Sequence, residues 1–91
     1  MTKRGKIWID FSMQVLRHIE DDTIRQYGDE GEDQLTNYTA EDCRKQVDKY
    51  QTRRGKTTRP GDDMLDILKE AHYLAEAWTK MNKKQEGGNQ K

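Results

Sequence analysis

Apolar residues recur at helical spacing in the C-terminal third of the chain, and this periodicity constrains the fold more than any other feature. They occupy positions 64, 65, 67, 68, 71, 74, 75, 78 and 81, so a helix over residues 62–81 is apolar on more than one stripe. To bury its apolar residues, such a helix must pack against other elements on more than one side. The pattern therefore predicts that residues 62–81 form the central helix of a bundle.

A second helix is predicted over residues 40–54. Thr39 is a favourable N-cap, and Asp42 follows three residues later in the manner of a capping box. Gly55 is placed where a helix commonly ends. The apolar stripe of this helix is thin and includes Cys43, which we expect to pack in the core rather than react.

A third helix is predicted over residues 11–27. Its apolar residues follow helical spacing from Phe11 to Tyr27, Asp10 or Ser12 can cap its start, and Gly28 can end it. The apolar run at positions 7–9 is too short for a buried strand. The loop that follows this helix has two glycines and no periodicity.

These elements predict an all-α fold, a small three-helix bundle that forms a single domain over residues 1–81, with a disordered tail over 82–91. Hydrophobic residues make up 31% of the chain and charged residues 37%, which is lean for a self-sufficient core. Because a domain this small buries only ~60% of its unfolded surface, we expect a homo-oligomer. With one cysteine, no membrane-length apolar stretch and no signal-like start, the expected location is cytoplasmic, with no membrane partner.

The net charge of zero conceals a basic, acidic, basic alternation. Residues 20–42 hold nine acidic residues and one arginine, whereas residues 43–59 hold seven basic residues and one aspartate. These segments could neutralise each other within the molecule, dock between subunits, or leave a basic patch for an external anion. An isoelectric point near 6.7 argues against binding to duplex nucleic acid.

The basic segment ends in RRGKTTRPG, residues 53–61, which resembles part of a phosphate-binding loop. Gly55, Lys56 and Thr57 match the last three places of G-x-x-x-x-G-K-[ST], but the first glycine would fall at Tyr50 and no strand precedes the segment. The P-loop interpretation therefore fails. A weaker hypothesis remains, in which the turn binds phosphate oxygens. Alternatively, the cations of the turn interact only with the helix dipole and with the acidic loop. The candidate ligand-binding residues are Lys49, Tyr50, Arg53, Arg54, Lys56, Thr57, Arg59 and Tyr73.

The stretches KYQTRRGK and DILKEAHYL resemble the K-Y-x-x-R-x-G-K and D-L-K-K-A-x-x-Y-L motifs of small phage and prophage proteins of the SaV-like family. The resemblance covers residues 43–78. It implies a phage origin, a helical hairpin and proximity to a nucleotide. No phosphate-transfer apparatus is recognisable, so kinase activity is not carried over.

Two kinds of binding function follow from these features. The first is a phage accessory protein with an anti-defence role, which captures a nucleotide or similar anion, such as a host immune nucleotide signal, at the basic turn between helices. The alternative is a protein inhibitor that presents the acidic segment 20–33 to a host protein in place of nucleic acid.

An enzymatic function is the second alternative, and it would need a metal site. Asp62, Asp66 and Glu70 form a carboxylate row at helical spacing, which would suit a Mg²⁺-dependent nucleotide pyrophosphohydrolase. The paired E-x-x-E motif of such enzymes is absent from the sequence, and His72 and Glu76 are spaced as a surface ion pair. We therefore expect no enzyme activity, catalytic residue, metal or cofactor.

Overall fold

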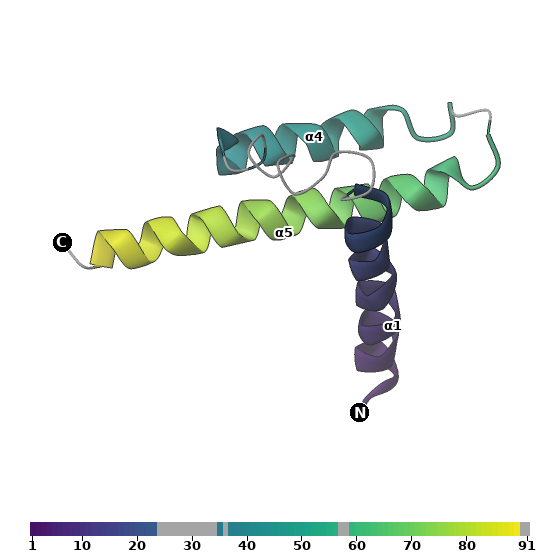
Figure 1. The fold of residues 1–91 in the computed structure, drawn as a ribbon, viewed down its shortest axis with the longest axis horizontal. Helices are drawn as coiled ribbons and strands as arrows, with labels where there is room; N and C mark the ends of the chain where they lie inside the picture. Colours follow the sequence, from purple (N-terminus) through teal and green to yellow (C-terminus); the bar gives the residue numbers. More distant parts are fainter. Residues whose placement is uncertain (24–34, 36, 57–58, 90–91) are drawn as a thin grey trace.

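Helices make up most of the chain, and two of them lie side by side as an antiparallel hairpin (Figure 1). The computed structural model describes residues 1–23, 35, 37–56 and 59–89. Its elements are α1 (Lys3–Arg17), the π-helix η1 (His18–Thr23), α4 (Ala40–Thr52) and α5 (Asp62–Asn89). No strand occurs within those ranges, so the predicted small all-α bundle is confirmed.

Helix α4 begins with the capping box that the sequence predicts. The Thr39 side chain accepts a hydrogen bond from the Asp42 amide at 3.0 Å, and the Asp42 carboxylate accepts one from the Thr39 amide at 2.9 Å. The helix ends at Thr52, two residues before the predicted boundary. Gly55 and Gly61 in the following turn adopt φ of 76° and 87°, a backbone conformation that glycine tolerates best.

The hairpin core is small. In the described part of the chain the buried apolar residues are Cys43 and Val47 of α4 and Ala77 of α5. Ala77 has little side chain to separate the helices, so the two backbones can approach each other closely.

Helix α1 begins eight residues before the start predicted at residue 11. Thr2, rather than Asp10 or Ser12, is the N-cap, because its side chain accepts a hydrogen bond from the Gly5 amide at 3.0 Å. The short apolar run at 7–9 thus lies within the helix. The α-helix ends at Arg17, and the π-helical turn of η1 carries the chain on to Thr23; the remainder of the predicted helix, residues 24–27, lies outside the described residues.

Helix α5 is longer than predicted. It continues past residue 81 to Asn89, so residues 82–89 of the tail that we expected to be disordered are helical. Residues 83–86 are two lysines, a glutamine and a glutamate, all of which have high helix propensity. The helix ends just after the glycine pair at 87–88, where propensity falls.

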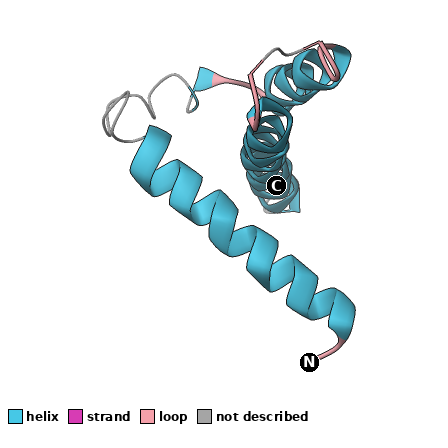
Figure 2. Ribbon diagram, turned by 90° about the vertical axis from the view of Figure 1, so that its right-hand side faces the viewer, coloured by secondary structure: helices cyan, strands magenta, loops and turns pink. Residues whose placement is uncertain are grey.

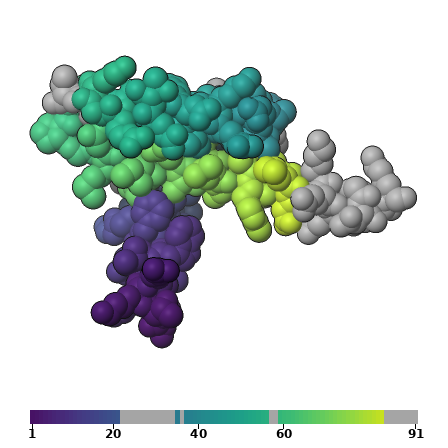
Figure 3. Space-filling view, turned by 180° about the vertical axis from the view of Figure 1, so that it is seen from behind, coloured from purple at the N-terminus to yellow at the C-terminus, as the bar shows by residue number. Residues whose placement is uncertain are grey.

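Helix α1 extends away from the hairpin, as Figures 2 and 3 show. It contains no buried residue, and the radius of gyration is 14.9 Å, compared with ~12 Å for a compact chain of this length. Large apolar side chains remain exposed on both long elements, among them Trp8 at 61% and Trp78 at 68%. Self-association, which the lean core predicts, therefore remains a prediction for which these surfaces provide a basis.

Candidate anion-binding site

Charged and aromatic side chains from both helices of the hairpin meet on one of its flanks. Lys49 and Tyr50 lie at the end of α4, four and three residues before its C-cap Arg53, and α5 contributes residues at i, i+3 and i+7. Residues three or four apart are neighbours on a helix surface. We call this group the Tyr50 cluster. Its members are Lys49, Tyr50, Arg53, Asp66, Lys69 and Tyr73.

The Tyr50 ring lies at the centre of the cluster. It stacks on Tyr73 with 6.1 Å between ring centroids and 28° between ring planes. The Arg53 guanidinium carbon lies 4.8 Å from its centroid, and the ammonium nitrogens of Lys49 and Lys69 each lie 5.6 Å from it. Cations at these distances are attracted to the ring, so one tyrosine gathers positive charge from two helices.

One of these cations is neutralised within the molecule. Arg53 donates two hydrogen bonds to Asp66, from Nε to Oδ2 at 2.9 Å and from Nη2 to Oδ1 at 2.5 Å. The bonds lower the pKa of the Asp66 carboxyl and raise the pKa of the Arg53 guanidinium. Because Asp66 is only 4% exposed and a buried carboxylate needs such a partner, this pair fixes α4 against α5.

The two lysines of the cluster differ from Arg53 in their ion pairing. In the described part of the chain no salt bridge joins Lys49 or Lys69 to a carboxylate. Together with the neutral Arg53–Asp66 pair, they give the cluster a formal charge of +2. The cluster itself is therefore cationic although the whole chain is neutral, and the Asp62 carboxylate is close enough to help raise the pKa of Arg53.

The structure brings together half of the residues that the sequence nominated for ligand binding. Lys49, Tyr50, Arg53 and Tyr73 all belong to the cluster, whereas Arg54, Lys56 and Arg59 are exposed on the turn beyond it. Thr57 lies outside the described residues. Sequence reasoning missed Lys69, and it assigned Asp66 to a carboxylate row rather than to Arg53.

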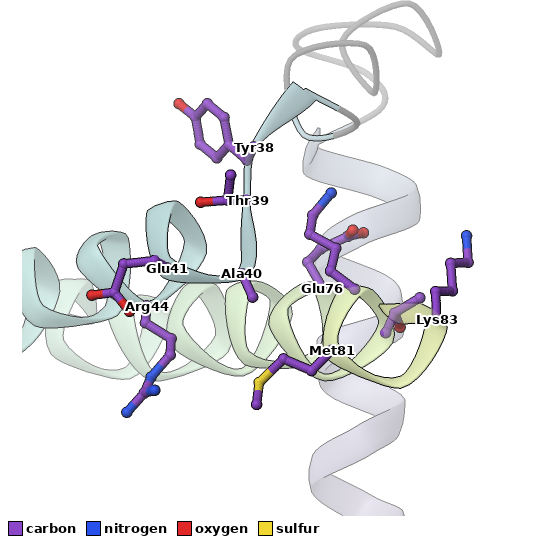
Figure 4. Close-up of a pocket in the computed structure, with 10 residues that line it drawn as sticks. Tyr38, Thr39, Ala40, Glu41, Arg44, Glu76, Met81 and Lys83 are labelled. Carbon is purple, nitrogen blue, oxygen red and sulfur yellow. The ribbon is translucent and has the colours of Figure 1, made fainter. Parts of the chain in front are cut away.

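A second feature that the sequence did not reveal is a cleft of about 970 Å³ near the start of α4. The cleft is lined by residues at the start of α4 and by residues from the second half of α5 (Figure 4). Its charged lining residues are Glu41, Arg44, Glu76, Lys80 and Lys83. Two carboxylates and three cations line this cleft, so its formal charge is +1, compared with +2 for the Tyr50 cluster.

No group of three or more potential metal ligands occurs among the described residues. The His72 imidazole Nε2 lies 3.8 Å from a Glu76 carboxylate oxygen. Burial lowers the pKa of His72, His18 lowers it further, and Glu76 offsets part of the shift. Burial likewise raises the pKa of the Cys43 thiol, which disfavours the nucleophilic thiolate.

No family model matches the chain, and no match was found among the curated proteins or the solved structures. Within the described residues, no helix has the length and apolar character needed to cross a membrane. The chemistry of the site itself must therefore carry any functional argument.

Proposed function

We propose that this protein is a non-enzymatic binding protein that captures a phosphate-bearing small molecule at the Tyr50 cluster. The observation that carries the proposal is the convergence of Lys49 and Lys69, from different helices, at 5.6 Å from the same ring centroid. Two ammonium groups beside one ring supply positive charge for the oxygens of a phosphate or diphosphate.

The cluster also favours ligands that combine phosphate with an aromatic ring. Tyrosine faces and lysine cations together are the combination that protein surfaces use for nucleotides, since bases stack and phosphates need positive charge. The proposal therefore includes nucleotides beside inorganic anions, with the Tyr50 and Tyr73 rings already stacked within the chain. The expected phage role, sequestration of a host immune nucleotide signal, rests on the family resemblance alone.

Arg53 takes a different part in this proposal from the one that the sequence suggested. Two of its guanidinium nitrogens already bind Asp66, so we assign it to positioning rather than to the ligand. By fixing α4 against α5, the Arg53–Asp66 pair holds Lys49 and Lys69 beside the Tyr50 ring. Of the acidic segment needed by the inhibitor alternative, Glu20 and Asp21 are exposed, and residues 24–33 lie outside the described residues.

Isothermal titration calorimetry with a ligand panel tests the proposal. The panel comprises inorganic pyrophosphate and mono-, di- and cyclic nucleotides, measured at low salt, where surface charges are least screened. We expect binding that weakens about tenfold with each of Lys49→Gln and Lys69→Gln, because each removes one charge-assisted contact.

Lys45→Gln is the matched control, because Lys45 is an exposed lysine of the same helix outside the cluster. It should bind as the wild type does. If no member of the panel binds, or if Lys45→Gln weakens binding as much as Lys49→Gln, the proposal is wrong.

A further inference from the structure

Helix α5 has three faces, and other elements of the chain cover two of them. Asp66 and Ala77 face α4, since both are buried and Asp66 binds Arg53. His72 faces the C-terminal end of α1, because α1 contacts α5, the His72 side chain is only 12% exposed, and His18, directly after α1, lowers its pKa. At 100° per residue, the third face is centred about 100° from the Asp66 direction.

This third face carries an apolar seam with alternating spacings of three and four residues. The seam consists of Met64, Ile67, Ala71, Leu74, Trp78 and Met81. A 3-4-3-4-3 spacing is the a/d pattern by which one helix packs along another. The seam therefore has the periodicity of a helix–helix interface, although no described helix of this chain lies on it.

The five large side chains of the seam are all exposed, and Ala71 between them is half-buried. Met64 is 75% exposed, Ile67 52%, Leu74 50%, Trp78 68% and Met81 49%. With typical side-chain areas, these five residues expose on the order of 250–450 Å² of apolar surface. A stable interface buries ~800 Å² per partner, a little over half of it apolar, so the seam can supply most of the apolar part of one such interface.

The order of residues along the seam suits an identical partner. Its midpoint falls between Ala71 and Leu74, so a two-fold axis at this point places the small Ala71 of each copy opposite Leu74 of the other. The same axis places Ile67 opposite Trp78, and Met64 opposite Met81. Each large side chain then meets an apolar side chain, and the one small residue leaves room for leucine.

We propose that this seam is a dimer interface through which α5 pairs with α5 of a second copy of the chain. The surface lies about 100° around α5 from the side that carries Asp66, so pairing leaves the Tyr50 cluster accessible. The dimer is independent of the proposed ligand, and one can fail without the other.

Sedimentation velocity of the full chain over a range of concentrations tests the dimer. We expect a dimer at tens of micromolar, and a monomer for Leu74→Glu at the same concentration. Met13→Glu is the matched control, because Met13 is 57% exposed on α1, and it should remain dimeric. Circular dichroism should show that Leu74→Glu keeps its helices, since Leu74 is half exposed in the single chain.

Two results would overturn the interface. The first is a wild-type chain that stays monomeric at sub-millimolar concentration, which would leave the seam to a different partner. The second is dissociation by Met13→Glu but not by Leu74→Glu, which would move the interface to α1. If Leu74→Glu loses helicity, Ile67→Gln replaces it as a milder variant of the same seam, and a Ile67→Gln chain that stays fully dimeric would count against the interface.

Discussion

The substitution Val47→Ala tests the hairpin core, because Val47 is 6% exposed and is one of three buried apolar residues in the described part of the chain. The change removes two methyl groups at ~0.8 kcal/mol each, and the space left behind adds to the cost. We expect the free energy of unfolding to fall by about 2 kcal/mol. For a chain of this size that loss corresponds to a decrease of ~8–16 °C in the melting temperature.

Thermal and urea unfolding followed by circular dichroism measure this loss, with both proteins at the same concentration. Leu16→Ala is the control, because Leu16 is 56% exposed on α1 and its truncation should change stability by less than ~0.5 kcal/mol. The reasoning fails if Val47→Ala is as mild as the control. In that case the contact between α4 and α5 would not be what stabilises the fold.

Three further substitutions test local features of the structure. Asp66→Asn should lower the melting temperature more than Asp48→Asn, an exposed change on α4, because only Asp66 accepts both hydrogen bonds from Arg53; equal effects would refute the pair. Thr39→Ala should cost about 1 kcal/mol of stability in urea unfolding by removing the N-cap, and no loss would exclude the capping box. The pKa of His72 is lowered from 6.5 by burial. As pH falls through about 6.5, His72 is therefore protonated in the unfolded chain before it is protonated in the folded chain, and the free energy of unfolding should fall. His72→Gln should flatten that dependence in melting curves recorded between pH 5 and 8, and an unchanged slope would contradict it.

The sequence predicts α4 well because local signals agree there. Thr39 and Asp42 mark the start of the helix, because they form two hydrogen bonds within a four-residue segment. The turn after the C-terminal end of the helix contains Gly55 with positive φ. Both signals depend on neighbouring residues only. Nothing distant needs to be known to place this element.

The boundaries of the other helices depend on weaker signals. The start of α1 at Lys3 was missed because a cap at Thr2 precedes Gly5, a residue of low helix propensity, and an apolar run typical of a strand. The tail after residue 81 was expected to be disordered from its polar composition. Its lysines and glutamate favour a helix that is already formed, and α5 continues to Asn89.

The candidate site was only half predictable, because its decisive contact joins residues 13 positions apart. Arg53 was nominated as a ligand for an external anion, and its partner Asp66 was grouped with other carboxylates. One signal was available in the sequence: Asp66 lies between Leu65 and Ile67 in the most apolar helix, where a charged residue needs a partner. The sequence of each helix taken alone does not identify the partner of Asp66, because the pairing depends on how α4 packs on α5.

The central claim is that Lys49 and Lys69 hold a phosphate group beside Tyr50, and the most direct test is a ¹H–¹⁵N NMR titration of the wild-type chain. The probe is pyrophosphate, followed by the tightest-binding nucleotide from the calorimetric panel. We expect saturable shifts centred on Tyr50, Lys69 and Tyr73. Shifts centred instead on the cleft around Arg44 and Lys80, or no saturable shifts with any probe, would contradict it.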